Sequence, residues 1–171
     1  MVDQPLGAAD LSAEEFSRNV AHAPDAALDE MMRGPQRRQI LDGVFRGMIE
    51  SADPDRLEGV DGVIHWHIGG RADGGEDVYE IVFRTGAVSV RSDPQETPRV
   101  TASVGGADFL KIASGNETRP ELFVAGKLKL EGDVAFAVRM GGIFKPPYRV
   151  KALAGTVLAG RPPEPGSSPA A

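Results

Sequence analysis

Hydrophobic residues follow two different periods along this chain, and the period changes near residue 60. Between residues 37 and 50, large apolar residues cover one face of a helix and charged residues of both signs cover the other. The apolar face consists of Ile40, Leu41, Val44, Phe45, Met48 and Ile49. A polar face of mixed sign is typical of a helix that lies on a protein core rather than on a membrane. The segment is therefore predicted to be a helix that covers the core and ends at Asp53-Pro54.

Two shorter helices are predicted before this one. Ser12 and Glu15 have the spacing of a capping box, which predicts a helix that runs to about Ala23. Asp25 lies at the start of a second short helix, which Gly34 ends. The chain is thus expected to begin with helices only.

From Val60 onward, apolar and polar residues alternate, which is the period of a strand with one buried face. Four such segments follow one another, separated by turns rich in glycine and proline. Their buried positions are Ile64, Trp66 and Ile68; Tyr79, Ile81 and Phe83; Val88 and Val90; and Val100, Ala102 and Val104. We expect these segments to form an antiparallel meander.

A short helix, a fifth strand and an apolar helix are predicted next. Residues 108–114 form the short helix, and residues 127–131 alternate polar and apolar side chains as a half-buried strand does. Asp133 suits the cap of a helix over residues 134–140, which are apolar nearly all the way round. Such a helix needs two apolar neighbours. One is the sheet, and the other is either protein core or an apolar ligand.

The domain organisation is predicted in three parts. Residues 1–34 form a helical extension packed on the main domain, and residues 35–159 form that domain. A last helix is expected from Val150. Residues 160–171 have the proline-rich composition of a disordered tail.

Composition excludes several classes of function. The chain has no cysteine, so disulfides, thiolate metal sites and thiol redox chemistry are excluded. A formal charge of −6 and an isoelectric point near 5.1 disfavour nucleic acid as a partner. No run of about 20 apolar residues is present, so stable membrane insertion is not expected. The N-terminus has no secretory leader pattern, and we expect a cytoplasmic protein.

Two histidines are the strongest candidates for chemistry. His65 and His67 lie two apart on a predicted strand, so both project from one face and would present two nitrogens to zinc. The register of the hairpin places Glu80 near His65, as a carboxylate partner or third ligand. Spacing fixes no further ligand, and no serine has a base at a fixed spacing. We therefore predict no metal, no cofactor and no catalytic residue.

The region around residue 130 resembles a known family. The residues that carry the resemblance are Phe123, Gly126, Lys127, Leu128, Lys129, Leu130, Gly132 and Asp133, with Asp108, Phe109, Leu110 and Gly115 upstream. In this order they resemble the sterol carrier protein 2 (SCP-2) family, over about residues 40–144. The resemblance implies an α+β fold, in which a five-stranded, mainly antiparallel sheet covered by helices encloses an apolar cavity. The additional N-terminal helices, the proline-rich end and the lack of a Ser-Lys-Leu address suggest a bacterial type.

The resemblance also implies a function. It indicates a non-enzymatic carrier that binds a sterol, a fatty acid or a fatty acyl-CoA and passes it to a lipid-metabolising enzyme or a membrane. Burial of several methylenes at about 0.8 kcal/mol each would give micromolar binding. Two alternatives remain: a structural or dimerisation module with a filled cavity, and a hydrolase or acyl-CoA-processing enzyme that uses His65 or Glu80.

Ten residues are the predicted lipid contacts. They are Trp66, Phe109, Leu122, Phe123, Leu128, Leu130, Phe136, Met140, Ile143 and Phe144. Those from residue 136 onward form a bulky stripe, which we expect to line the cavity and its mouth. A stripe of small residues is expected to pack on the sheet instead. It consists of Val134, Ala137, Val138 and Gly141.

Overall fold

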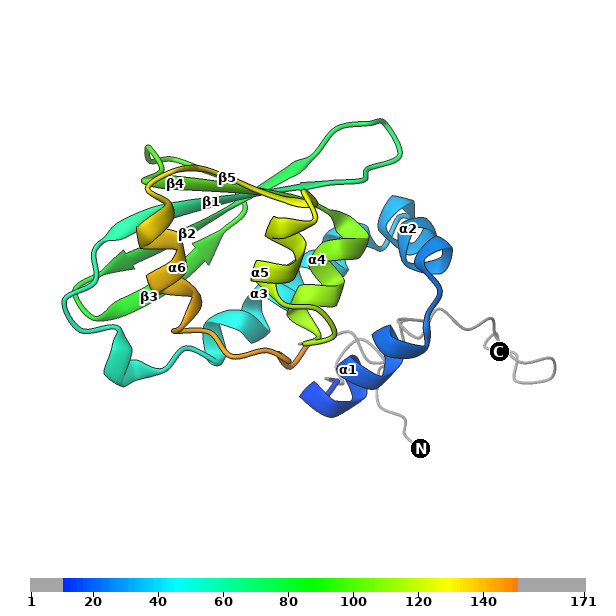
Figure 1. Ribbon diagram of the computed structural model, residues 1–171, viewed down its shortest axis with the longest axis horizontal. Helices are drawn as coiled ribbons and strands as arrows, with labels where there is room; N and C mark the ends of the chain where they lie inside the picture. Colours follow the sequence, from blue (N-terminus) through cyan, green and yellow to red (C-terminus); the bar gives the residue numbers. More distant parts are fainter. Residues whose placement is uncertain (1–10, 151–171) are drawn as a thin grey trace.

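The protein folds into two layers, a five-stranded sheet and a layer of helices against one of its faces (Figure 1). The computed structural model describes residues 11–150. The helices in this range are α1 (Ala13–His22), α2 (Asp25–Arg33), α3 (Arg37–Glu50), the 3-10 helix η2 (Pro54–Arg56), α4 (Gly106–Ala113), α5 (Arg119–Val124) and α6 (Val134–Gly141). The strands are β1 (Gly62–Gly69), β2 (Asp77–Arg84), β3 (Ala87–Arg91), β4 (Val100–Gly105) and β5 (Leu128–Gly132). The predicted α+β class is confirmed.

The strand order is β3-β2-β1-β4-β5, and only the first three strands form the predicted meander. β4 pairs with β1 in parallel, Ile64 opposite Val100, and all other pairings are antiparallel. The prediction that β4 continues the meander was therefore wrong. The alternation of a strand fixes which side is buried but not which strand lies beside it. Here the segment after β3 crosses the outer face of β2, where the Glu80 carboxylate accepts hydrogen bonds from the backbone amides of Gln95 and Glu96.

The N-terminal helices begin and end where the sequence indicates. Ser12 and Glu15 form the capping box, with hydrogen bonds of 2.9 and 3.1 Å. Both α1 and α2 pack against α4, and their apolar sides are buried in the common core. Leu11 forms an antiparallel bridge with Val150, which joins the two ends of the described chain. The boundary between a 1–34 extension and the main domain stays a prediction.

A buried arginine fixes the junction between the first helices and the sheet. The Arg37 guanidinium donates to the Asp77 carboxylate over 2.7 Å and to the carbonyls of Met32, Ile68 and Gly69. Its side chain therefore ties the ends of α2 and β1 to the start of β2. Hydrogen bonds to this charged group offset the cost of its burial.

Under β1 and β2, aromatic side chains fill the space between the sheet and the helices. Phe45 of α3 stacks on Tyr79 at 4.3 Å and on Phe109 at 4.9 Å between ring centroids. We call Phe45, Tyr79 and Phe109 the aromatic stack. Trp66 meets Phe109 edge-on at 5.5 Å, so its indole borders the stack.

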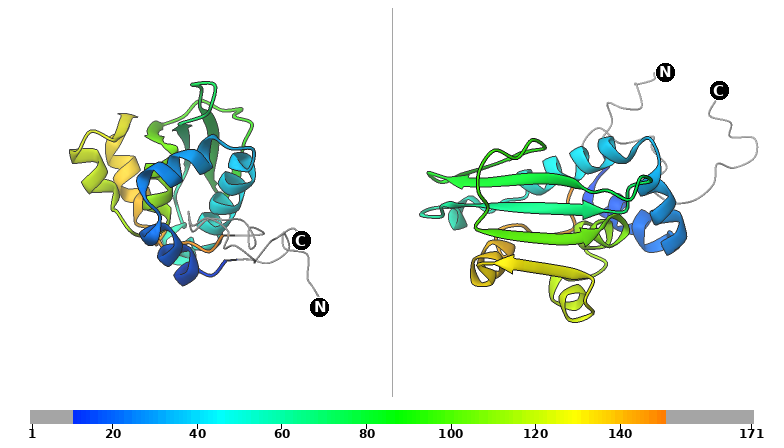
Figure 2. Two further views of the ribbon diagram at one scale, coloured as in Figure 1. Left: turned by 90° about the vertical axis from the view of Figure 1, so that its right-hand side faces the viewer. Right: turned by 90° about the horizontal axis from the view of Figure 1, so that it is seen from above.

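Helices α5 and α6 lie together with β5 along one edge of the sheet (Figure 2). The predicted fifth strand and its following helix are present, and the Asp133 carboxylate caps α6 by accepting from the Phe136 amide. Gly132 has a φ of +105°, and a Cβ there would lie 2.6 Å from the Arg99 carbonyl oxygen. Only glycine fits this approach of β5 to β4.

Two expectations concern residues beyond those described. Val150 itself lies in the bridge with Leu11, and the remainder of the helix predicted from it lies outside the described residues. The predicted tail over 160–171 also lies outside them. Within residues 11–150, no helix combines the length and the apolar character that crossing a bilayer requires.

Candidate functional site

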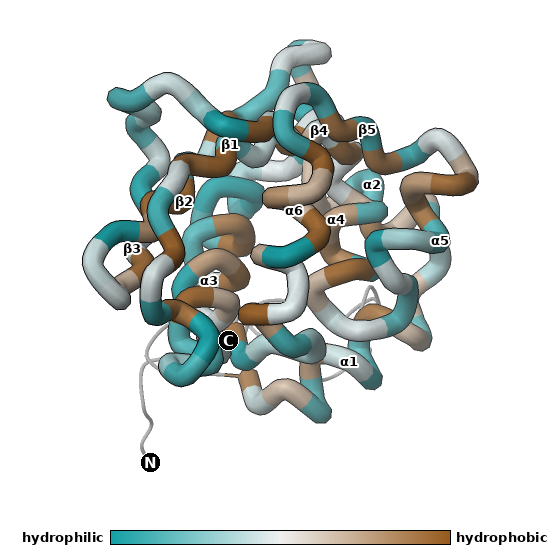
Figure 3. Tube along the Cα trace, turned by 60° about the vertical axis from the view of Figure 1, so that its left-hand side comes forward, coloured by the Kyte–Doolittle hydropathy of each residue, from teal (hydrophilic) through white to brown (hydrophobic). Residues whose placement is uncertain are grey.

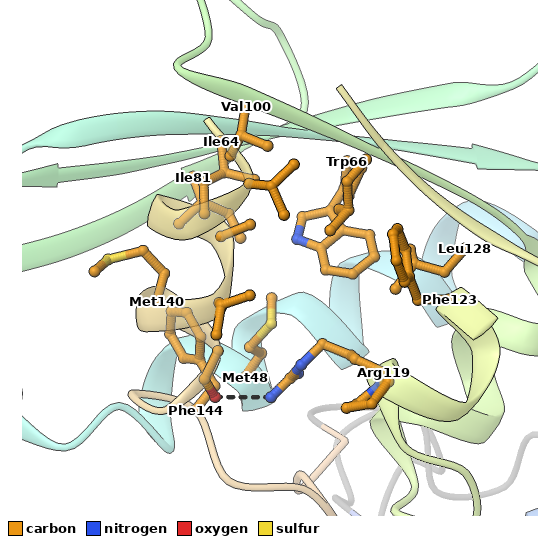
Figure 4. A pocket seen from close by; sticks show the side chains of 17 residues that line it. Met48, Ile64, Trp66, Ile81, Val100, Arg119, Phe123, Leu128, Met140 and Phe144 are labelled. Carbon is orange, nitrogen blue, oxygen red and sulfur yellow. Dashed lines mark hydrogen bonds between the residues drawn. The ribbon is translucent and has the colours of Figure 1, made fainter. Parts of the chain in front are cut away.

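A cavity of about 360 Å³ lies between the inner face of the sheet and helices α3, α5 and α6 (Figure 4). Alternate residues of four strands form its floor, since successive side chains of a strand point to opposite faces. These floor residues include Ile64, Trp66, Ile81, Val100, Leu128 and Leu130. The lining is apolar except at one arginine. A cavity of this kind holds a hydrophobic ligand without any specific polar contact.

Helix α6 forms one wall, with only part of the stripe that was predicted to line it. Met140 and Phe144 line the cavity as expected, whereas Phe136 and Ile143 are buried elsewhere. The Phe136 ring packs edge-on against Phe83 at 6.1 Å and lies under the Arg99 guanidinium at 4.1 Å. It belongs to the solid core at the start of α6.

The small stripe of α6 also differs from the prediction. Val134, Ala137, Val138 and Gly141 were predicted to pack on the sheet, and all four line the cavity. Val138 is 70% exposed and Val134 is 40% exposed, so these two residues stand at the mouth. Residue spacing identifies both stripes but not the rotation of the helix about its axis. That rotation follows from the Asp133 cap, which Arg99 holds with a 3.0 Å ion pair.

The mouth has an apolar rim formed by α5 and α6. Within residues 11–150, the large hydrophobic side chains that remain exposed are Phe123, Val124, Val134 and Val138. Two lie on α5 and two on α6, and Figure 3 shows a strongly hydrophobic part of α5 at the periphery of the molecule. Phe123, Val134 and Val138 also line the cavity, and we call these three residues the apolar rim. Exposed apolar residues gathered at one place mark a binding or interaction site more often than scattered ones do.

Helix α5 itself was missed in the sequence. Thr118 and Glu121 form a capping box, with reciprocal hydrogen bonds of 3.2 and 2.9 Å, and Pro120 lies in the first turn. This is the same signal that identified α1. The helix is only six residues long and is followed closely by β5. Its capping box was therefore overlooked in favour of the pattern of the strand.

Arg119 is the charged residue among those that line the cavity. Its Nη2 donates to the Gly141 carbonyl over 2.7 Å, and its Nη1 donates to the Tyr148 hydroxyl over 3.5 Å. Figure 4 shows the guanidinium reaching from α5 toward α6, on the side of the cavity away from the sheet. Sequence reasoning did not single out this residue, because no pattern distinguishes one helix-start arginine from another.

His65 and Glu80 lie on the opposite face of the sheet from the cavity. As the register predicts, they are paired across β1 and β2, with His65 Nε2 2.9 Å from Glu80 Oε2. Burial alone would raise the pKa of Glu80, but hydrogen bonds from Arg91, the Glu96 amide and His65 outweigh it and lower the pKa to about 2. The pair therefore anchors the crossing segment after β3. In the described part of the chain, no three His, Cys, Asp or Glu side chains are grouped to hold a metal ion.

The ten predicted contact residues divide into two groups. Six line the cavity: Trp66, Phe123, Leu128, Leu130, Met140 and Phe144. Four are buried outside its lining: Phe109, Leu122, Phe136 and Ile143. Lining residues that the prediction left out include Met48, Ile64, Ile81, Val100 and Arg119. The strand members of this last group already had the inward parity, so the alternation of the strands would have identified them.

Comparison with known proteins gives a consistent result. The sequence model described as the SCP-2 sterol transfer family matches residues 42–145. Hydroxysteroid dehydrogenase-like protein 2 of Bos taurus is 25% identical over 118 residues, which are 68% of this chain and 28% of that protein. Non-specific lipid-transfer protein-like 1 of Caenorhabditis elegans is 29% identical over 75 residues, 44% of this chain and 64% of that protein. The chain thus spans only part of the length of these relatives.

Solved structures share the fold. The sterol carrier protein domain 2 of Helicoverpa armigera matches 64% of this chain and 87% of its own, with 21% identity and a TM-score of 0.54. The palmitated SCP2L2 of Aedes aegypti matches 63% of this chain and 96% of its own, with 20% identity and a TM-score of 0.50. At these identities, the likeness establishes the arrangement of the elements.

Proposed function

Because this chain belongs to the SCP-2 sterol transfer family, we propose that it is a lipid carrier that holds a hydrophobic molecule in the cavity between the sheet, α5 and α6. The observation that supports this most directly is the cavity itself, an apolar space of about 360 Å³ that side chains leave unfilled. A protein interior of ordinary density has few voids larger than a water molecule. An apolar void of this size costs stability unless a ligand fills it.

The size of the cavity suits a single acyl chain. At roughly 30 Å³ for each water-sized group, it has room for about a dozen such groups. Burial of ten methylenes at about 0.8 kcal/mol each gives about 8 kcal/mol, which corresponds to micromolar affinity. The palmitated state of the Aedes aegypti protein and the name of the nematode relative support a lipid of this class.

The apolar rim supports an entrance between α5 and α6. A lipid that enters there passes from one apolar surface to another, since Phe123 and Val138 are both exposed and part of the lining. A donor membrane, or an enzyme that uses the lipid, would meet the carrier at this rim.

The two alternatives have weaker support. A structural module with a filled cavity has no use for the open volume. An enzyme that uses His65 and Glu80 would act on the face of the sheet opposite the cavity, where Arg91 and the segment after β3 cover Glu80. The dehydrogenase-like name of the bovine relative applies to a protein of which this chain matches 28%.

A cavity-filling substitution tests the proposal. Ala137 lines the cavity, whereas Ala135, two residues earlier on the same helix, is exposed and outside it. We expect Ala137→Phe to weaken palmitic acid binding at least tenfold in isothermal titration calorimetry, and Ala135→Phe to bind as the wild type does. Native mass spectrometry of freshly purified wild type should show a bound lipid. No binding by the wild type, or unchanged binding by Ala137→Phe, would reject the carrier function.

A further inference from the structure

The lining of the cavity includes one cation that no carboxylate of the described residues neutralises. Arg119 is half-buried, and its hydrogen bonds go to the Gly141 carbonyl and the Tyr148 hydroxyl. Neither acceptor carries a charge, because burial raises the pKa of the Tyr148 hydroxyl and keeps it protonated. An arginine has five N–H donors and stays charged at any physiological pH. Donors and a full positive charge therefore remain for another partner.

Other arginines that are half-buried or buried in residues 11–150 have different surroundings. Arg37 pairs with Asp77 and Arg91 pairs with Glu80, in both cases with direct hydrogen bonds to the carboxylate. A partly desolvated cation without a counter-ion is costly, whereas a bidentate carboxylate or phosphate offsets that cost. At Arg119 the described residues supply no such anion, so its place is open to a ligand.

The backbone at α6 makes room for this guanidinium. A Cβ at Gly141 would lie 3.3 Å from Arg119 Nε, closer than an ordinary van der Waals contact. Residue 141 therefore has to be small for the guanidinium to lie against the end of α6. The arginine is held by α6 and yet borders the cavity, with Met48 and Phe144 beside it (Figure 4).

We propose that Arg119 binds the anionic head group of the ligand, so that the cavity selects single-chain lipids ending in a carboxylate or phosphate over neutral lipids of the same length. This inference rests on the proposed carrier function and narrows it. The apolar chain lies on the floor formed by the sheet, and the head group lies at the guanidinium. A neutral sterol or fatty alcohol leaves Arg119 without a counter-charge and binds less tightly.

A set of ligands with one chain and different heads tests this inference. Dodecanoic acid, dodecyl phosphate, 1-dodecanol and dodecyltrimethylammonium share the chain and differ in charge. A hydrogen-bonded ion pair favours the anions over the alcohol by about tenfold to a hundredfold in affinity. Titration calorimetry at pH 7.5 on the full chain measures this ratio. The ratio of acid to phosphate shows which of the two anions the site prefers.

Variants assign the effect to Arg119. Arg119→Gln should lower affinity for dodecanoic acid to that of 1-dodecanol and leave the alcohol unaffected, and Arg119→Lys should keep part of the preference. Arg139→Gln removes the same charge from an exposed position of α6 outside the lining, and should bind as the wild type does. Circular dichroism confirms that each variant is folded.

The outcomes separate the two proposals. If no dodecyl ligand binds any variant, the carrier function fails. If all bind the wild type with equal affinity, or if Arg119→Gln keeps the preference for anions, the carrier function stands and the role of Arg119 is rejected. An equal loss of anion affinity in Arg139→Gln would also reject it, because the effect would then be one of overall charge.

Discussion

The inner face of the sheet is covered by closely packed side chains in one region and borders an open cavity in another. Under one part of it, the aromatic stack of Phe45, Tyr79 and Phe109 fills the space between sheet and helices with ring centroids 4.3 and 4.9 Å apart. Under the other, apolar side chains of β1, β2, β4 and β5 face α5 and α6, and about 360 Å³ stays open. Strand type and hydrophobicity are alike in both. The difference lies on the helix side: Phe45 and Phe109 pack against the first region, whereas the side chains of α5 and α6 leave space under the second.

The two regions also differ in how many apolar side chains they expose to solvent. Helix α3, which contributes Phe45, keeps its apolar residues covered, with Ile40, Leu41, Val44 and Phe45 fully buried. The exposed large apolar residues found in the described structure all belong to α5 and α6. The apolar side of α3 is covered by the core. Helices α5 and α6, in contrast, present apolar side chains both to the cavity and to the surface of the protein.

The largest expected effect concerns Phe136, which the structure assigns to the solid core rather than to the cavity. Phe136→Ala should lower the free energy of unfolding by about 3–5 kcal/mol, because it removes the contacts with Phe83 and Arg99 and leaves a void. Denaturant unfolding measures the loss. Val138→Ala, at a 70% exposed position of the same helix, is the control and should change stability by about 0.5 kcal/mol or less. A loss below about 1 kcal/mol for Phe136→Ala would place it back at the cavity.

Leu110 is a leucine of the filled region, fully buried on α4 and outside the cavity lining. Leu110→Ala should cost about 2–5 kcal/mol of stability, as large-to-small changes in a packed core do. Palmitic acid affinity should stay within about threefold of the wild type, measured at a temperature where the variant is folded. Strong loss of affinity without loss of stability would show that the two regions are not separate.

Acid should destabilise the protein by protonating Glu80 on the outer face of the sheet. The folded-state pKa of Glu80, about 2, lies below the ordinary glutamate value of 4.5, so its contribution to stability is complete above pH 4.5 and is lost as the pH falls toward 2. The unfolding midpoint of the wild type should fall more steeply over this range than that of Glu80→Gln, which is less stable at pH 7. The exposed Glu58→Gln serves as the control. Parallel pH profiles for wild type and Glu80→Gln would contradict the pKa assignment.

The smallest expected effect on stability is at Leu130, the matched leucine of the cavity region. Leu130 lines the cavity and is only partly buried, so Leu130→Ala removes few contacts from the ligand-free protein and should cost about 1 kcal/mol or less. Palmitic acid affinity should fall about tenfold instead, because the lost contacts are those with the chain. The comparison with Leu110→Ala uses one chemical change at two places. Equal losses of stability in the two variants would show that side chains fill the cavity in solution.

The sequence predicted the elements of this fold better than their arrangement. Strand alternation identified the buried side of every strand, and the capping box of Ser12 and Glu15 located the start of α1. Strand order was beyond it, because the place of β4 beside β1 depends on a crossing segment that Glu80 holds from a distant part of the chain. The presence of a cavity was implied only by family resemblance.

The candidate site was predicted in part for a similar reason. The cavity residues on strands could be predicted, because the alternation of a strand assigns each side chain to one face of the sheet. The stripe of α6 was misassigned because rotation of a helix depends on tertiary contacts such as that between Arg99 and Asp133. Arg119 gave no signal, because its proposed role depends on the lack of a nearby carboxylate among residues 11–150, and only the three-dimensional structure shows this.

Trp66 lies on the border between the two regions, with an edge against Phe109 and with its indole bordering the cavity. It is the single tryptophan of the sequence. Indole emission shifts to shorter wavelength when its surroundings lose water, so the intrinsic fluorescence of this protein comes from one chromophore placed where the occupant would lie. The unmodified chain thus contains its own optical reporter. Filling and emptying can be followed in real time, on the wild-type protein and without a dye that competes for the same space.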